Sequence, residues 1–294
     1  MTVPVPQHYA HFDEGCGTQA ADSLMIARAC KETNPMGEYI SMYPSSFEEG
    51  VSIANRLLNR HSRAKASIAG EIFGLMFVCG QREFRIDKLL FGRDEKLGHV
   101  NSWCLEKLNE LRSLGCNEKL LTSVYLSFWD RSEGKAYRDS VALSETKHLE
   151  VADWIRLRTG FAGPFYTLCL AILDIEHAEL VLATTYDKMV VFIDDVNDIV
   201  SIEKDRRCGV LNSLSHTESP QSRPLGAIAE LFGLINRFDP ETVGKIAIFM
   251  MDYISWHLES ERYLDMGPQF RRTCESWVAL IASYLASYGS NQGD

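Results

Sequence analysis

The sequence has no excess of basic charge, and this absence excludes one large class of partners. Lysine and arginine sum to 30 residues against 40 aspartates and glutamates, so the formal net charge of the 294-residue chain is −10 at pH 7. Binding to nucleic acid requires a basic surface that neutralises phosphates. The charge balance therefore indicates a protein without a nucleic-acid partner.

The cysteines lack the spacing of a zinc site or a redox motif, both of which use closely spaced residues. The sequence contains no C-x-x-C pair. The eight cysteines are Cys16, Cys30, Cys79, Cys104, Cys116, Cys169, Cys208 and Cys274. We expect free thiols in a reducing compartment, because cysteines stay unpaired there.

Long apolar runs and a secretory leader are also missing. The most apolar stretch begins at Phe165, and charged residues interrupt it from Asp174 onward, before it reaches the ~20 apolar residues of a membrane helix. The first residues do not place a basic segment before an apolar one, as a signal peptide would. We therefore expect a cytoplasmic protein without a membrane span.

Apolar residues recur at three- and four-residue spacing over most of the chain, and strand-type alternation is scarce. This periodicity predicts an all-α fold with a single domain over residues 46–294, after an irregular N-terminal segment over residues 1–45. Gly160 and Gly163-Pro164 are the expected break between two helices. The predicted helices span 46–60, 64–80, 100–113, 117–130, 147–159, 164–176, 178–205, 225–237, 240–266 and 270–287.

One predicted helix carries a polar stripe that ordinary core-and-surface patterning does not require. Asn197, Ser201 and Asp205 are spaced i, i+4 and i+8, so an α-helix projects all three from one face. Their amide, hydroxyl and carboxylate oxygens are hard ligands of the kind that Mg²⁺ takes, and Lys204 could contact a phosphate. The alternative interpretation is an acidic face turned to solvent, formed by Asp195, Asn197, Asp198, Glu203 and Asp205.

A second acidic pattern overlaps this stripe. Asp194-Asp195-x-x-Asp198 is a literal D-D-x-x-D, in which Asp194 and Asp198 share a helix face while Asp195 points elsewhere. These carboxylates form a competing candidate for a metal site, although acidic matches of this length are common by chance. The residues alone leave both interpretations open.

The run from Asn197 to Asp205 resembles the second metal-binding motif of class I terpene synthases, N-D-x-x-S-x-x-x-E, with Asp as its last residue. Downstream, W-H-L-E-S-E-R-Y over residues 256–263 is similar to the Arg-Tyr element of the trichodiene synthase family. Upstream, W-I-R-L-R-T-G over residues 154–160 resembles the diphosphate-sensing arginine and the helix break after it. The three matches occur in the order that the family has.

This resemblance implies an all-helical class I terpene synthase bundle around an apolar pocket for a prenyl diphosphate, expected to be farnesyl diphosphate. Mg²⁺ on Asn197, Ser201 and Asp205 would assist departure of the diphosphate, and the carbocation would cyclise in a dry cavity. The resemblance is also compatible with a homodimer. The groups implied in contacting the diphosphate are Arg156, Lys204, Arg262 and Tyr263.

Two further assignments follow from the same resemblance. Gly160 would permit a kink in its helix, and Arg156 is chosen over Arg158 because it lies four residues before that glycine. Aromatic side chains are the candidate walls of the cavity, although such residues are more often ordinary core. They are Phe73, Phe77, Tyr166, Phe192 and Trp256.

The Asp-rich motif that the family keeps on an earlier helix is missing. Spacing places it in residues 74–84, G-L-M-F-V-C-G-Q-R-E-F, which contain no aspartate. Glu83 or Asp87 could substitute as a single ligand, and Arg82 and Arg85 could instead offset diphosphate charge directly. Three functions stay open: cyclisation, capture of the carbocation or of a terpenoid by an amine or water as second substrate, and binding without catalysis.

Overall fold

The computed structural model describes residues 43–79, 95–133, 151–208, 219–264 and 266–290, together with residues 40, 212 and 214. Every regular element within these residues is helical, so the predicted all-α class is confirmed. The predicted irregular segment lies almost entirely outside them. The elements are α3 (Pro44–Leu58), α4 (Arg63–Cys79), α6 (Glu95–Ser113), α7 (Glu118–Glu133), α9 (Val151–Ile172), α10 (Ala178–Cys208), α11 (Ser222–Ile235), α12 (Pro240–Glu259), η2 (Glu261–Tyr263, a 3₁₀ turn) and α13 (Pro268–Ser290).

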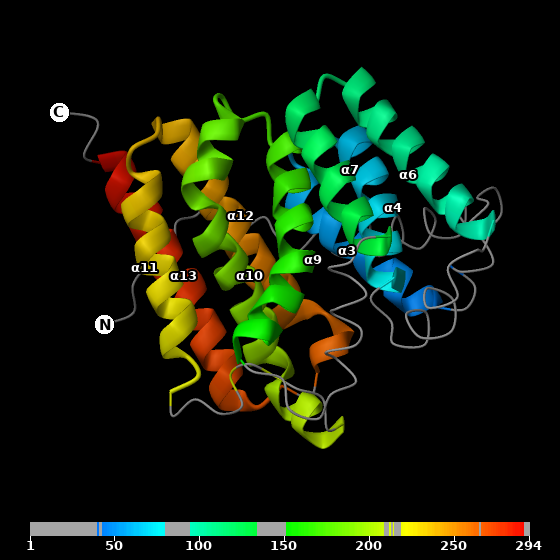
Figure 1. Cartoon of the computed structure of the whole chain (residues 1–294). Helices are drawn as coiled ribbons and strands as arrows, with labels where there is room; N and C mark the ends of the chain where they lie inside the picture. The colour runs from blue at the N-terminus through cyan, green and yellow to red at the C-terminus, as the bar shows by residue number, and fades with distance from the viewer. Residues whose placement is uncertain are drawn as a thin grey trace.

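The helices α9 and α10 lie at the centre of the arrangement. α10 packs against α9, α11, α12 and α13, while α9 also packs against α3, α4 and α7. Figure 1 shows α3, α4, α6 and α7 on one side of α9, and α11 and α13 beyond α10 on the other. α12 connects the two groups because it contacts both α3 and α13.

The local sequence explains where α12 begins and ends. The Asp239 carboxylate accepts a hydrogen bond from the Thr242 N–H at 2.9 Å, and Pro240 occupies the first turn, where a missing N–H costs nothing. Ser260 is extended, with φ −68° and ψ 131°, and its side chain accepts the Arg262 N–H. The predicted helix over 240–266 is therefore wrong at its end, because Ser260 stops α12 and starts η2.

The predicted break at Gly160 and Gly163-Pro164 is also wrong, because α9 runs unbroken through both. A proline inside a helix removes one hydrogen bond and crowds the carbonyl four residues earlier. Packing offsets that cost, since residues 162–173 are all buried. Gly163 allows α10 to approach closely: a Cβ at this position would overlap the Tyr186 hydroxyl.

The α3 and α4 helices meet through glycine. A Cβ added to Gly50 would lie within 2.5 Å of the Gly74 Cα, and one added to Gly74 would lie 2.6 Å from the Phe47 ring. Neither distance is compatible with a real side chain, so the two helices can pack this closely only with glycine at both positions.

We expect Gly50→Ala to lower the free energy of unfolding by about 1–3 kcal/mol, because the backbones of α3 and α4 must separate to admit one methyl group. Urea denaturation followed by far-UV circular dichroism measures this. Gly226→Ala in α11 is the matched control, since its Cβ meets nothing within 4 Å. Because alanine favours a helix more than glycine does, Gly226→Ala should raise the free energy of unfolding by roughly 0.5–1 kcal/mol. Equal effects of the two substitutions would contradict the contact.

Two of the absences noted in the sequence can be compared with the structure. None of the helices in the described ranges is both long enough and apolar enough to cross a membrane. Cys104, Cys116, Cys169 and Cys274 are free thiols and buried, as expected. The side chains of the other four cysteines lie outside the described part of the chain.

Candidate active site

The polar stripe of α10 lies inside the molecule. Asp195 and Asp198 have no exposed surface, Ser201 and Asp205 are 4% and 6% exposed, and Asn197 is half-buried. The alternative of an acidic face turned to solvent is therefore wrong for Asp195, Asp198 and Asp205. Burial of polar groups is costly unless they have hydrogen-bond partners, so their partners define the site.

Ser201 and Asp205 form one polar cluster with Asn212, which follows α10. The Ser201 hydroxyl donates to Asp205 Oδ2 at 2.6 Å. The Asn212 amide donates to the same oxygen at 2.9 Å and to the Asp198 carbonyl at 2.7 Å. Asn212 is 1% exposed. Sequence reasoning missed this residue, because it belongs to a polar stretch of sequence without a periodic pattern.

Asn197 is connected to the other end of the site by Tyr263. The Tyr263 hydroxyl donates to Asn197 Oδ1 at 2.9 Å across 66 residues of sequence, and Tyr263 is 3% exposed. Two cations lie by its ring: Lys204 Nζ is 5.6 Å from the ring centroid and Arg262 Cζ is 5.7 Å from it. The structure thus brings together four of the sequence-predicted site residues, from α10 and η2.

Arg262 is held by a carboxylate that sequence reasoning missed. Its Nη1 lies 2.6 Å from Glu49 Oε2 of α3, across 213 residues, and its side chain is 31% exposed. The neighbouring Tyr263, Glu49 and Asp205 raise the pKa of Arg262, although burial lowers it. The guanidinium is therefore charged throughout the physiological range, beside both the α10 cluster and solvent.

The competing D-D-x-x-D interpretation finds no support in the structure. Asp195 is paired with Arg223 of α11: Arg223 Nε donates to Asp195 Oδ2 at 2.8 Å, and Nη2 contacts the other oxygen. In the part of the chain that the structure describes, no group of three His, Cys, Asp or Glu side chains could hold a metal ion. Asp195 therefore links α10 to α11.

Several predicted residues cannot be compared with the structure at the level of side chains. Arg156, Arg158 and Gly160 lie within α9, but their side chains are outside the described part. The same holds for Arg82, Glu83, Arg85 and Asp87, which follow α4. Their predicted roles stay predictions.

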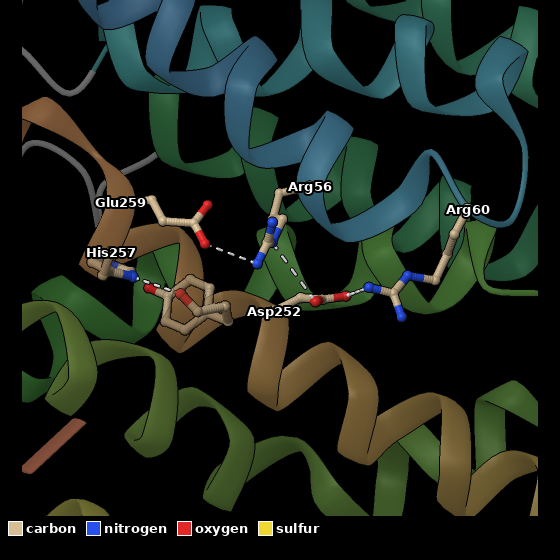
Figure 2. A network of polar contacts seen from close by, with 6 residues as sticks. Arg56, Arg60, Asp252, His257 and Glu259 are labelled. Carbon is tan, nitrogen blue, oxygen red and sulfur yellow. Dashed lines mark hydrogen bonds and ion pairs between the residues drawn. The ribbon is translucent and has the colours of Figure 1, made fainter. Parts of the chain in front are cut away.

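A second polar network joins α3 to α12 beside the site (Figure 2). Asp252 lies 2.5 Å from Arg60 Nη2 and 3.8 Å from Arg56 Nε, and Arg56 Nη2 donates to Glu259 at 3.1 Å. Burial raises the pKa of Asp252 to about 6, although Arg60 and Arg56 act in the opposite direction. The sequence contained no sign of this network, because its partners lie about 200 residues apart.

The ring of His257, also on α12, contacts the rings of Tyr253 and Tyr263. It is 1% exposed, and its ring centroid lies 4.6 Å from that of Tyr253 and 5.0 Å from that of Tyr263. Its Nδ1 is 2.8 Å from the Tyr253 carbonyl, which can only accept, so Nδ1 carries the proton. Burial lowers the pKa of His257 to about 3. The charge of Arg262 lowers it further, whereas the hydrogen bond to the Tyr253 carbonyl acts in the opposite direction. The ring is neutral at pH 7.

The α10 donors fit the chemistry of a magnesium site in part. Asn197, Ser201 and Asp205 offer amide, hydroxyl and carboxylate oxygens from one helix face, and Mg²⁺ prefers oxygen ligands. Only Asp205 brings a charge. A cation here would need further oxygens from water and from a phosphate, as Mg²⁺ sites commonly have.

Comparison with known proteins identifies no relative: no family model, no curated protein and no solved structure matches the chain. The geometry of the described residues is therefore the basis for any function.

Proposed function

We propose that the chain is a class I terpene synthase-like enzyme that releases diphosphate from a prenyl diphosphate, expected to be farnesyl diphosphate. The observation that carries this proposal is the hydrogen bond from Tyr263 to Asn197. It joins the Arg-Tyr element to the polar face of α10, two motifs that lie 66 residues apart in the sequence. If the two matches had arisen by chance, no hydrogen bond between them would be expected.

The charges around Tyr263 suit a diphosphate leaving group. Cleavage of an allylic C–O bond leaves the electron pair on the diphosphate, whose growing negative charge must be neutralised. The guanidinium of Arg262 and the ammonium of Lys204 lie on the Tyr263 ring and would supply that charge. Mg²⁺, when held by Asn197, Ser201 and Asp205, would add Lewis-acid stabilisation of the same oxygens.

The neighbouring core offers the aromatic surroundings that a carbocation needs. Ring contacts continue from Tyr263 through His257 to Tyr253, and from Tyr253 to Phe165 and Phe192. Aromatic faces attract cations, and a water-free environment prevents their early hydration. Of the predicted cavity walls, Phe73, Tyr166, Phe192 and Trp256 belong to this buried core. Their role as walls of a cavity is part of the proposal.

A second outcome on the same fold is favoured by one observation. Residues 74–84 contain no aspartate, so the site has fewer carboxylates for metal ions than the family pattern requires. In this second function, an amine or water captures the carbocation or a preformed terpenoid, and the protein acts as a transferase or hydrolase. Diphosphate departure depends on the same side chains in both functions.

Incubation of the purified full-length protein with farnesyl diphosphate and Mg²⁺ tests the proposal. We expect diphosphate release, and we expect Asn197→Ala to slow it at least tenfold, about 1.4 kcal/mol of lost transition-state stabilisation. Asn109→Ala is the matched control, since Asn109 is exposed on α6 and accepts a hydrogen bond from Arg112 of the same helix. Gas chromatography of the organic extract identifies the terpenoid product.

The products separate the alternatives. A cyclic hydrocarbon or alcohol indicates cyclisation, whereas a linear alcohol, or release only with an added amine, indicates capture by a nucleophile. Undiminished release by Asn197→Ala would remove the α10 face from the mechanism. No release together with binding of the intact substrate would leave a binding protein in place of an enzyme.

A further inference from the structure

The Asn212 side chain has a defined orientation against α10. Its amide nitrogen donates to three oxygens: the Asp198 carbonyl at 2.7 Å, Asp205 Oδ2 at 2.9 Å and Ser201 Oγ at 3.4 Å. Its carbonyl oxygen accepts the Leu214 N–H at 3.0 Å. Because Oδ1 is engaged by a backbone donor, the NH₂ group must be the end that faces Ser201 and Asp205.

The surroundings hold this orientation in place. Asn212 is 1% exposed and Leu214, to which it is bonded, has no exposed surface. If the amide left these oxygens, it would have to find new partners, because a buried donor without a hydrogen bond destabilises the protein. The side chain is therefore held at the α10 cluster from both of its polar ends.

The amide nitrogen lies beside the two oxygens through which Ser201 and Asp205 would bind a cation. Both of these oxygens are within 3.4 Å of it, and an NH₂ group presents partial positive charge to them. Mg²⁺ requires its ligand oxygens at about 2.0–2.1 Å, whereas an N–H···O bond spans about 2.7–3.2 Å. A cation that bridged the two oxygens on the side of the amide would therefore meet the NH₂ group.

We propose that Asn212 competes with the divalent cation, so that its amide occupies the cation position until metal and diphosphate displace it. The inference rests on the proposed function, because it takes Ser201 and Asp205 as metal ligands. The cost of displacing the amide lowers the affinity for the cation alone. A diphosphate that adds further oxygens to the cation compensates for this cost, so the metal binds tightly only together with substrate.

Mn²⁺ binding without substrate, followed by electron paramagnetic resonance, tests the competition. We expect Asn212→Ala to bind Mn²⁺ at least fivefold more tightly than the wild type, and Asp205→Ala to lose the site. Asn109→Ala again serves as the matched control and should leave the affinity unchanged. Affinity that is equal or weaker in Asn212→Ala would overturn the proposal, since Asn212 would then be a bystander or a ligand.

A second variant keeps the test independent of the folding of the first. Asn212→Asp replaces the donor by a carboxylate beside Asp205, so the midpoint of thermal unfolding should fall without metal. Mg²⁺ should then raise the midpoint of this variant by more than it raises that of the wild type, because the new carboxylate adds a ligand. An equal Mg²⁺ effect on both proteins would overturn the proposal.

The results also distinguish this inference from the proposed function. The expected Mn²⁺ pattern without any diphosphate release would support the competition at a metal site that has another purpose. Diphosphate release with unchanged Mn²⁺ affinity in Asn212→Ala would keep the enzyme and overturn the competition. Absence of Mn²⁺ binding in every variant would overturn the competition and remove the metal from the proposed mechanism.

Discussion

Arg223→Ala is expected to lower the free energy of unfolding by about 3–5 kcal/mol, the range for loss of one partner of a buried ion pair. Asp195 has no exposed surface and is bonded through both oxygens to Arg223, whose own side chain is 32% exposed. Removal of Arg223 takes the guanidinium away from a carboxylate that is fully buried in the folded protein. Denaturation with guanidinium chloride, followed by tryptophan fluorescence, measures the change in the free energy of unfolding.

Two control variants separate this effect from the effect on stability of removing any arginine. Arg237→Ala removes an exposed arginine near the end of α11 and should change the stability by less than about 0.5 kcal/mol. The double variant Asp195→Asn/Arg223→Ala should recover part of the lost stability, because burial of a neutral amide costs less free energy than burial of a carboxylate. Equal losses in Arg223→Ala and Arg237→Ala would contradict the importance of the pair.

The second large effect concerns pH. Asp252→Asn should make the protein more sensitive to acid, and His257→Phe should make it less sensitive, each by up to about 1.4 kcal/mol per pH unit between roughly pH 4 and 6. Both residues lie on α12 and are buried, but burial moves the pKa of the carboxyl and that of the imidazole in opposite directions. Their contributions therefore nearly cancel in the wild type.

The signs follow from proton uptake by the folded and unfolded chains. The folded-state pKa of Asp252 is about 6, above its ordinary 3.8, so its contribution to stability is full below pH 3.8 and is lost as the pH rises through 6. The folded-state pKa of His257 is about 3, below its ordinary 6.5. Its contribution is therefore full above pH 6.5 and is lost as the pH falls toward 3.

Urea denaturation of the wild type, both single variants and the double variant at several pH values measures these slopes. Asp252→Asn also changes the contacts with Arg60 and Arg56, and this shifts the absolute stability of the variant. The slope, and not the absolute stability, is therefore the informative quantity. Parallel curves for wild type and both single variants would contradict the opposed contributions.

The fold class was predictable from the sequence because helical periodicity is a local property. The errors lie where a local signal competes with packing. Gly160 and Pro164 are turn residues, but the buried residues 162–173 hold α9 together across them. Ser260 is a weak signal inside an apolar pattern, yet its extended backbone ends α12 and places Arg262 and Tyr263 in a separate turn.

The candidate site was predictable only where it follows helix spacing or resembles a family motif. Asn197, Ser201 and Asp205 share a face of α10 for reasons of geometry, so the sequence could identify them. Glu49 and Asn212 could not be found in this way. Each becomes relevant through a partner on another segment, and no periodic pattern encodes such a contact.

The distance in sequence between α3 and its polar partners has a consequence for the order of synthesis. Gly50 allows α3 to pack on α4 as soon as both helices have left the ribosome, since they are neighbours in the chain. Glu49 and Arg56 gain Arg262 and Glu259 only after 213 and 203 further residues. A nascent chain that stops before α12 therefore contains α3 without these ion-pair partners, so the Arg262 side of the site can form only late in synthesis.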